Sequence, residues 1–230
     1  MKKHILLFLI TSLLVGCSSS SLTDLEKTSQ YTGGEIMGDA TSFYWVTENI
    51  QYPVSSADYV NDGQSGWYKT DYKWANGSVR ELIRKGETLE NGKGLVPFSI
   101  VIRFDQNGEA IYQQYRLDGQ ILPLTEAQLV RYLEEAQHVA TVVNRQKSQG
   151  TELIQGIWNG KSFKSCSGKV YDKLEFNQTL PKIVATRLSS VESYIALLGN
   201  KSRHSVEVNK LLLMADENQS CIQRPDFSNE

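Results

Sequence analysis

The sequence is poor in the side chains that build most metal sites. It has three histidines and three cysteines in 230 residues, with no His-x-x-x-His pair and no Cys-x-x-Cys pair. Asp58, Asn61 and Asp62 come closest to a calcium loop, but their spacing departs from the EF-hand pattern and a turn between strands explains them better. No Gly-x-Gly-x-x-Gly or Walker-type glycine loop precedes a predicted helix. We therefore expect no metal and no other cofactor.

The sequence also contains few residues that could act in catalysis. Beyond the N-terminal region the histidines are His138, which we interpret as a partly exposed residue of a helix surface, and His204, which we place on a hairpin surface. The segment Gly63-Gln64-Ser65-Gly66 lacks the Gly-x-Ser-x-Gly spacing of a hydrolase nucleophile elbow. We predict that the protein is not an enzyme and assign no catalytic residues.

Long hydrophobic runs and long basic runs are missing as well. The apolar segment at residues 5–15 is interrupted by Thr11 and Ser12 and spans roughly ten residues, whereas a membrane-spanning helix needs about 20. A formal net charge of −2 without a basic run argues against nucleic acid as a partner. Because Lys2 and Lys3 precede it, the apolar segment indicates an export signal.

The export signal ends in Leu14-Val15-Gly16-Cys17, which resembles the lipobox of bacterial lipoproteins. The resemblance implies that residues 1–16 are a signal peptide and that Cys17 is the lipidated residue, whose acyl chains hold the protein on a membrane. A soluble secreted protein with a chance cysteine is the alternative. Ser18 stands where an aspartate would favour the inner membrane, which implies an outer-membrane lipid anchor with the domain facing the periplasm. Residues 17–41 are expected to be a lipidated tether.

The remaining cysteines form an even pair once Cys17 is lipidated. Cys166 and Cys221 would lie in an oxidising compartment, so we predict a disulfide between them. It closes a loop of about 55 residues and adds on the order of 4 kcal/mol to the stability. Two free thiols or a metal pair are the alternatives, but neither cysteine has a second cysteine or a histidine nearby.

Turn signals recur from residue 42 onward as pairs in which Asn or Asp precedes Gly. The pairs are Asp62-Gly63, Asn76-Gly77, Asn91-Gly92, Asn107-Gly108, Asp118-Gly119 and Asn159-Gly160. Such pairs supply the positive φ angles that two-residue hairpin turns need. We predict one hairpin whose strands, residues 67–74 and 79–84, flank Asn76-Gly77.

The turn predicted at Asn107-Gly108 also fixes a register. The opposed residues are Phe104 and Ile111, Ile102 and Gln113, Ile100 and Tyr115, and Phe98 and Leu117. This register puts a largely apolar set on one face, as in a half-buried antiparallel hairpin. Asp118-Gly119 then turns the chain so that Leu122 lies opposite Tyr115 in a third strand.

A helix is predicted to begin after Thr125. Thr125 and Gln128 fit a capping box, and Leu124 and Leu129 fit the accompanying hydrophobic staple. The apolar residues that recur at helical spacing are Leu129, Tyr132, Leu133, Ala136, Ala140 and Val143. The helix should pack one face on the sheet and end near residues 147–150.

After this helix we predict a strand pair around Asn159-Gly160, a short helix after Pro181 and a last hairpin through Gly199-Asn200. The expected fold class is α+β: an antiparallel, meandering β-sheet or open barrel of about eight strands, with one main amphipathic helix packed on it. Residues 42–230 are expected to form a single globular domain.

Three segments carry strand-and-turn signatures: Asp71-Tyr72-Lys73-Trp74-Ala75-Asn76-Gly77, Ile102-Arg103-Phe104-Asp105-Gln106-Asn107-Gly108 and Gly156-Ile157-Trp158-Asn159-Gly160. They resemble an uncharacterised family of gammaproteobacterial envelope lipoproteins, the YjaH-like group, over most of residues 42–225. The resemblance implies an envelope location and a domain type. It implies no activity and no site residues, because that family has no assigned activity.

An aromatic cluster is the candidate binding surface. It consists of Trp67, Tyr68, Tyr72 and Trp74. Tyrosine and tryptophan combine an apolar face with a polar group and can stack on sugar rings or on a protein partner. Cross-strand aromatic pairs also stabilise sheets directly, which is the structural alternative.

We expect a non-catalytic outer-membrane lipoprotein that presents a binding or scaffolding surface to another cell-envelope component. Its partners would be the membrane, through the N-terminal lipid, and an envelope protein or glycan. The alternatives are a carrier or sensor of a small apolar ligand in a β-sheet cavity and an envelope hydrolase that uses one of the histidines. An outward aromatic cluster favours the first class and a sealed apolar cavity the second. A histidine within about 3 Å of a serine or carboxylate in a cleft favours the third.

Overall fold

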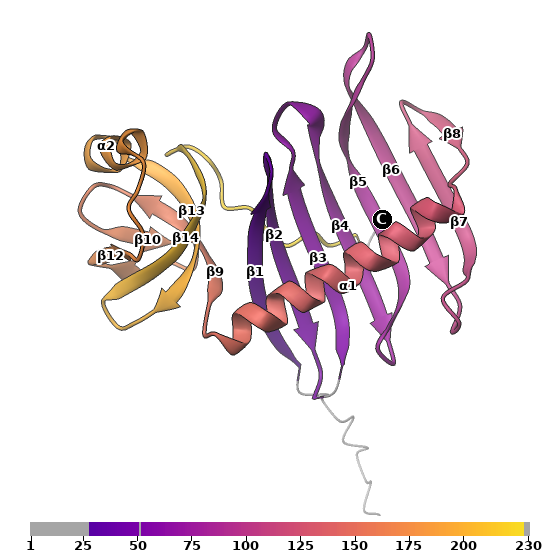
Figure 1. Ribbon diagram of the computed structural model, residues 1–230, viewed down its shortest axis with the longest axis horizontal. Coiled ribbons are helices and arrows are strands. Elements are labelled where there is room, and N and C mark those ends of the chain that lie inside the picture. Colours follow the sequence, from indigo (N-terminus) through magenta and orange to yellow (C-terminus); the bar gives the residue numbers. More distant parts are fainter. Residues whose placement is uncertain (1–27, 51, 228–230) are drawn as a thin grey trace, which may run out of the picture.

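Two β-sheets connected by a long helix form the part of the chain that the computed structural model describes, residues 28–50 and 52–227 (Figure 1). We call the sheet of β1 to β8 the large sheet and the sheet of β9 to β14 the small sheet. In the large sheet each strand pairs with the next one along the chain, so that the whole sheet is an antiparallel meander. The expected α+β class is therefore confirmed.

The large sheet occupies the first half of the described residues. Its strands are β1 (Ser29–Met37), β2 (Ala40–Glu48), β3 (Pro53–Asn61), β4 (Gly66–Ala75), β5 (Ser78–Glu90), β6 (Gly94–Phe104), β7 (Ala110–Leu117) and β8 (Gln120–Leu122). A 3-10 helix, η1 (Gly63–Ser65), precedes β4.

Two of the predicted hairpin turns are confirmed by their backbone angles. Asn76 and Asp118 have positive φ angles, as do the glycines that follow them. A positive φ at both central residues is the signature of the turn that matches the twist of a hairpin. The expected pairing of Leu122 with Tyr115 is also observed.

The turn between β6 and β7 differs from its prediction. The expected pairs of Ile100 with Tyr115 and of Ile102 with Gln113 are present, but Phe104 pairs with Ala110. The reason is Asp105, whose Oδ1 accepts hydrogen bonds from the backbone N–H groups of Asn107 at 2.8 Å and Glu109 at 2.9 Å. These bonds stabilise a wider loop, and the register shifts just before Phe104.

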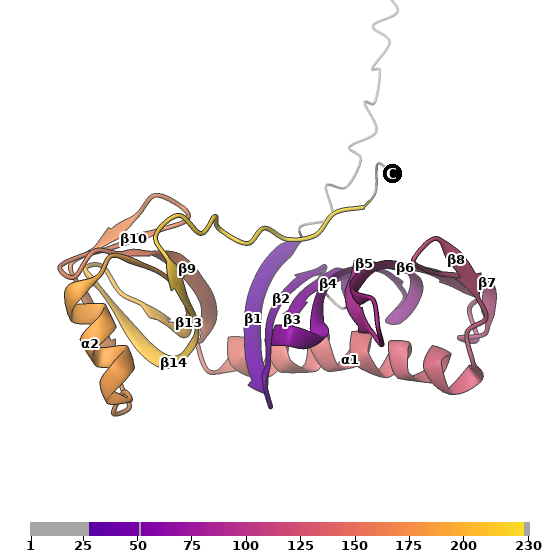
Figure 2. The same ribbon diagram turned by 90° about the horizontal axis from the view of Figure 1, so that it is seen from above.

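The main helix, α1 (Glu126–Ser148), begins and ends where the sequence predicts. Thr125 and Gln128 form the capping box, with Gln128 Oε1 accepting a hydrogen bond from the Thr125 N–H at 2.8 Å. Figure 2 shows the large sheet curving around α1, which lies along its concave face. Apolar side chains from both elements form a core there, including Tyr72, Leu82 and Ile102 from the sheet, all fully buried.

The expected tether of residues 17–41 is wrong in its second half, because residues 29–37 form β1 and pair with β2. Gly33 and Gly34 are buried, and Gln146 of the last turns of α1 bonds the backbone of Gly34. A Cβ atom on Gly33 would lie 2.2 Å from Gln146 Oε1 and would displace the end of that side chain. Residues 1–27 lie outside the described residues, and the signal peptide and the lipidation of Cys17 therefore stay predictions.

The small sheet follows α1 and contains the remaining strands. They are β9 (Glu152–Trp158), β10 (Phe163–Ser165), β11 (Val170–Tyr171), β12 (Lys173–Phe176), β13 (Ser193–Lys201) and β14 (Ser205–Asp216), in the spatial order β11-β10-β9-β13-β14-β12. Its strands are antiparallel except for the parallel pair of β12 with β14. The second helix, α2 (Lys182–Ser190), packs Leu188 and Val184 on this sheet and confirms the short helix predicted after Pro181.

The small sheet agrees with the predicted strand pairs and differs from the prediction at its last turn. The strand pair around Asn159-Gly160 is confirmed by β9 and β10. The last hairpin is confirmed by the antiparallel pair of β13 and β14, but its turn does not lie at Gly199-Asn200, since both residues are inside β13 and pair with Val208 and Glu207. Gly199 instead lies at a bulge where a Cβ atom would approach the Glu207 carbonyl oxygen to 2.2 Å, so glycine serves a close backbone contact there.

The two sheets share an apolar interface. Phe43 of β2 is fully buried among Leu153, Tyr194, Ala196 and Leu212 of the small sheet. Along their strands, the residues of this interface alternate with residues that face the other way, toward the core under α1 in the large sheet and toward the core under α2 in the small sheet. Both sheets are therefore packed on both faces in this region.

The C-terminal segment, residues 217–227, connects the sheets a second time. It leaves the small sheet and runs over the convex face of the large sheet (Figure 2). Cys221 forms the predicted disulfide with Cys166, with a Cα–Cα distance of 6.1 Å. Further along, Arg224 lies 3.4 Å from Asp71 of β4 and donates a hydrogen bond to Ser55 Oγ at 3.0 Å.

Neither α1 nor α2 combines the length and the apolar character that a membrane-crossing helix requires, and these are the α-helices of the described residues.

Candidate functional site

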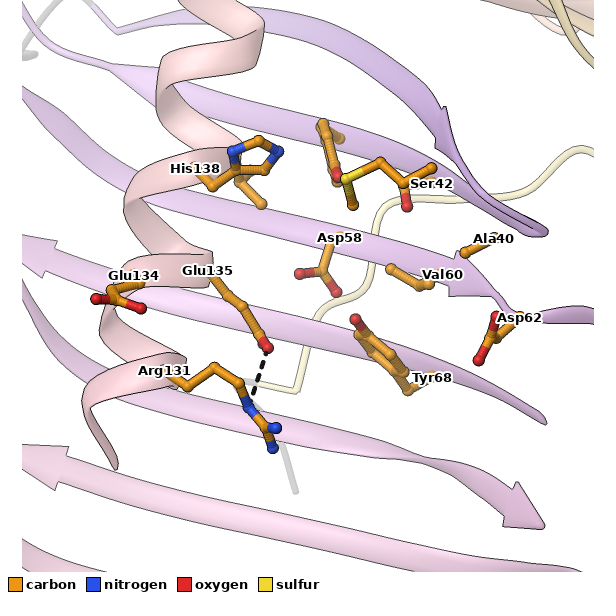
Figure 3. Close-up of a pocket in the computed structure, with 13 residues that line it drawn as sticks. Ala40, Ser42, Asp58, Val60, Asp62, Tyr68, Arg131, Glu134, Glu135 and His138 are labelled. Carbon is orange, nitrogen blue, oxygen red and sulfur yellow. Dashed lines mark ion pairs between the residues drawn. The ribbon is translucent and has the colours of Figure 1, made fainter. Parts of the chain in front are cut away.

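An open cavity of about 510 Å³ lies between α1 and the first four strands of the large sheet (Figure 3). The buried residues of its floor are Ser42, Tyr44, Asp58, Val60 and Val139. Its mouth is polar, with the exposed residues Asp62, Arg131, Glu134 and His138. The cavity therefore combines a largely apolar interior with a charged rim.

Strand alternation explains why polar side chains reach this floor. Tyr44, Asp58, Thr70 and Arg84 are successive cross-strand partners on β2, β3, β4 and β5. Side chains of directly opposed residues point to the same face of a sheet, here the concave face under α1. The sequence thus places a buried carboxylate and a buried guanidinium in the middle of an otherwise apolar face.

A hydrogen-bonded network satisfies most of these buried groups. Tyr72 Oη donates to Asp58 Oδ2 at 2.8 Å and accepts from Arg84 Nη2 at 3.2 Å. Arg84 Nε donates to Thr70 Oγ1 at 2.8 Å, and Arg84 Nη2 donates to Glu135 Oε2 of α1 at 2.7 Å. Arg84 also lies 3.9 Å from Asp58 Oδ2. This network ties α1 to the sheet directly below the cavity.

Burial alters the protonation of the network. It raises the pKa of Asp58, an effect that the positive charge of Arg84 opposes. Burial and the nearby Asp58 carboxylate also raise the pKa of Tyr72 well above its usual value, so Tyr72 stays protonated and serves as a donor. Burial likewise raises the pKa values of Tyr44 and Tyr68, which line the cavity as neutral phenols.

Two buried polar atoms of the floor have no hydrogen-bond partner among the residues that the structure describes. They are Asp58 Oδ1 and Ser42 Oγ. Asp58 is 3% exposed and Ser42 is fully buried. Buried polar atoms are paired in the great majority of cases, so an unpaired atom in a cavity wall marks a place for a ligand or a water molecule.

His138 meets one condition set for a hydrolase, because its Nε2 lies 2.5 Å from Glu35 Oε1 at the cavity mouth. Tyr44 Oη donates to the same Glu35 oxygen at 2.9 Å. A triad also needs a nucleophile on the second ring nitrogen. Among the described residues no hydroxyl group hydrogen-bonds the His138 ring, and Ser42 Oγ is unpartnered. The pair holds α1 to β1 and lacks an activated nucleophile.

The aromatic cluster is not one surface, which corrects the expectation for it. Tyr72 is fully buried and Trp74 is 8% exposed, and both belong to the core under α1. Tyr68 lines the cavity, while Trp67 points to the opposite face of β4 and donates to Glu87 Oε2 at 2.9 Å. Alternation along β4 therefore divides the cluster between two faces of the sheet.

Metal binding finds no support in the described ranges 28–50 and 52–227, where no group of three or more His, Cys, Asp or Glu side chains is arranged to hold an ion. His204 lies 3.4 Å from Asp172 on the surface, with both side chains about 70% exposed. The assignment of Asp58 to a turn is wrong, because Asp58 lies inside β3.

Sequence reasoning missed Asp58, Arg84, Ser42 and Glu135 as site residues. The sequence contains a signal for Arg84. It lies two residues after Leu82 in the predicted hairpin, so both side chains point to the same, inward face. The pairing of β3 with β4 is needed to show that Asp58 shares that face.

Comparison with known proteins gives a family and no activity. No curated protein and no solved structure matches the chain. The family model described as "Protein of unknown function (DUF1481)" matches residues 32–226. The matched range extends from β1 into the C-terminal segment and includes the whole cavity. This chain therefore belongs to the DUF1481 family of proteins of unknown function.

Proposed function

We propose that this protein is a non-catalytic binding protein of the bacterial cell envelope, and that it takes a small ligand with an apolar body into the cavity between α1 and the large sheet. The observation that carries the proposal is the cavity itself, with a buried floor that includes two unpartnered polar atoms.

The size and lining of the cavity support binding of a small molecule. Its volume of about 510 Å³ lies in the range of ligand pockets, which is about 300–1,000 Å³. Such pockets combine apolar walls with a few placed polar groups. Here Tyr44, Val60 and Val139 supply apolar wall, and Ser42 and Asp58 supply polar atoms. The cavity is open rather than sealed, so one end of the ligand would stay at the rim.

The envelope location rests on the sequence. Leu14-Val15-Gly16-Cys17 fits a lipidation signal, and the YjaH-like resemblance and Ser18 favour the outer membrane. The Cys166–Cys221 disulfide supports an oxidising compartment, because such bonds are rare in the bacterial cytosol.

Presentation of a surface to an envelope protein or glycan is the second candidate function. It is favoured by a shallow depression of about 400 Å³ on the convex face, where Tyr59, Trp67 and Lys69 lie against residues 219–223. An aromatic side chain beside a lysine is suited to stacking on a sugar ring or a peptide.

Filling the cavity tests the proposal. Ala40 is half-buried and lines the cavity, so Ala40→Trp would place an indole in it. We expect the wild type to bind a naphthylamine dye with a rise in fluorescence, and Ala40→Trp to bind it about tenfold more weakly or worse, since the dye and the indole compete for the same volume. Fluorescence titration measures both affinities.

The matched control is Ala75→Trp, which adds the same side chain at an exposed position at the end of β4. It should bind the dye like the wild type. A wild-type protein that does not bind the dye, or equal affinities of the wild type and Ala40→Trp, would show that the cavity is not a binding site.

A further inference from the structure

We infer that the ligand is an amphipathic cation, in which an ammonium group is attached to an apolar body, and that Asp58 binds the ammonium at the floor of the cavity. The inference rests on the proposed function, because it specifies the chemistry of the molecule that the cavity takes.

Asp58 offers an acceptor that the protein itself leaves unused. Its Oδ2 accepts from Tyr72, but its Oδ1 has no partner in the described part of the chain although the residue is 3% exposed. An unpaired buried carboxylate oxygen is unfavourable, and a hydrogen-bond donor on a ligand would remove this cost. Asp58 is part of the cavity wall (Figure 3), and its Oδ1 is covered, so a ligand donor reaches this oxygen when the side chains around it move.

Ser42 adds a second polar contact on the same floor. Its Oγ is fully buried and unpartnered, and a hydroxyl group accepts or donates equally well. An ammonium has three donors and no acceptor, so it suits a carboxylate oxygen and a hydroxyl oxygen together. The two unpaired atoms therefore have a common explanation in one ligand group.

The charges around the cavity favour a cation over an anion. The carboxylates that line it are those of Asp58, Asp62, Glu134 and Glu135. The basic side chains in the lining are Arg131, which lies 3.6 Å from Glu135 (Figure 3), and His138, which is held by Glu35. A ligand with a carboxylate or phosphate would meet an excess of negative charge.

Arg84 offsets part of this excess, because it lies 3.9 Å from Asp58 and bonds Glu135, but it is not part of the cavity lining. Its guanidinium bonds Thr70, Tyr72 and Glu135. Its central carbon lies 4.1 Å from the ring centre of Tyr68 and 5.0 Å from that of Tyr132. The two aromatic rings shield Arg84, so the floor of the cavity offers the ligand carboxylates and hydroxyls rather than the Arg84 guanidinium.

Three probes with the same apolar chain test the inference on the wild-type protein. Decylamine is positively charged at pH 7, decanol is neutral and decanoate is negatively charged. We expect decylamine to displace the naphthylamine dye at a concentration about tenfold or more below that of decanol, and decanoate to bind most weakly. Each probe is used below its micelle concentration.

Two variants test whether Asp58 causes the preference for decylamine over decanol. Asp58→Asn keeps the shape of the side chain and removes its charge, so the preference for decylamine over decanol should fall about tenfold or more while decanol affinity stays near the wild-type value. Asp71→Asn is the matched control. Asp71 is also a buried carboxylate, 8% exposed, but it faces Arg224 on the other side of β4. This control should keep the wild-type preference.

The outcomes separate the two proposals. Equal affinity for the three probes, or tightest binding of decanoate, would overturn the inference while the cavity would still bind apolar chains. If no probe displaces the dye from the cavity, the proposed function fails and the inference fails with it. Because the comparison of probes needs no variant, it remains decisive even if Asp58→Asn does not fold.

Discussion

At the scale of single residues, Gln146 has the clearest structural role outside the cavity. Its side-chain amide accepts from the Gly34 N–H at 3.0 Å and donates to the Gly34 carbonyl oxygen at 2.7 Å. Both bonds are buried and join the last turns of α1 to β1, the first strand of the large sheet. The side-chain amide of Gln146 thus makes the two hydrogen bonds that a neighbouring strand would otherwise make with Gly34 at this edge of the sheet.

Gln146→Ala should lower the free energy of unfolding by about 2 kcal/mol or more, because it leaves the N–H and C=O of Gly34 buried and unpaired. Urea denaturation measures the change. Gln137→Ala, at an exposed position of the same helix, is the control and should change stability by about 0.5 kcal/mol or less. Equal effects of the two substitutions would contradict the role assigned to Gln146.

The residues of the site were harder to predict than those of the core. Thr125 and Gln128 were found because a capping box is a local pattern of four residues. Asp58 and Arg84 come together only through the registers of β3 with β4 and of β4 with β5. A buried ion pair is not visible from either residue alone, since both types are usually exposed.

At the scale of elements, local signals predicted the hairpins well and long-range contacts poorly. The hairpin at Asn76-Gly77 and the helix after Thr125 follow from residues adjacent in sequence, and both are observed. β1 was assigned to a tether because its glycines carry no apolar signal. A Cβ atom on Gly33 would meet Gln146, and one on Gly34 would meet Ser42 and Leu212, so these glycines serve contacts that are distant in the sequence.

The C-terminal segment is the element that depends most on a covalent link. Residues 217–227 form no helix or strand, and they are attached by the disulfide, by Arg224 and by the N–H of Ile222, which donates to Gln155 Oε1 at 2.9 Å. Hydrogen bonds and ion pairs that are partly exposed contribute little each, so the disulfide should dominate.

We expect Cys166→Ser combined with Cys221→Ser to lower the free energy of unfolding by about 2–5 kcal/mol, since the unfolded chain is no longer constrained by the bond. Adding a reductant should destabilise the wild type by a similar amount and leave the double variant unchanged. A double variant as stable as the oxidised wild type would contradict this account of the segment.

At the scale of the whole molecule, the sequence predicted the large meander and its helix but not the division into two sheets. One sheet of about eight strands was expected for residues 42–230, whereas the structure has an eight-stranded sheet that includes β1, from the expected tether, and a second sheet of six strands. The later strands were predicted as isolated pairs, and their union through β9 with β13 and β12 with β14 joins segments that lie far apart along the chain. Such pairings carry no local turn signal.

The cavity is likewise a property of the whole fold. It exists because α1 crosses the concave face of a curved sheet (Figure 2). Two separate contacts hold the helix there: Arg84 bonds Glu135 near the cavity, and Gln146 bonds Gly34 near the end of the helix. A helix set across a curved sheet leaves space where the side chains between them are short, as Ala40 and Ser42 are.

The most direct test of ligand binding is native mass spectrometry of the full-length protein, extracted in mild detergent from the cells that make it. We predict an excess mass from one bound small molecule, released on activation as a positive ion. The excess should be absent from Ala40→Trp and present in Ala75→Trp. A wild-type protein that carries no small molecule, or an Ala40→Trp variant that carries the same one, would contradict the proposal that this cavity binds a ligand.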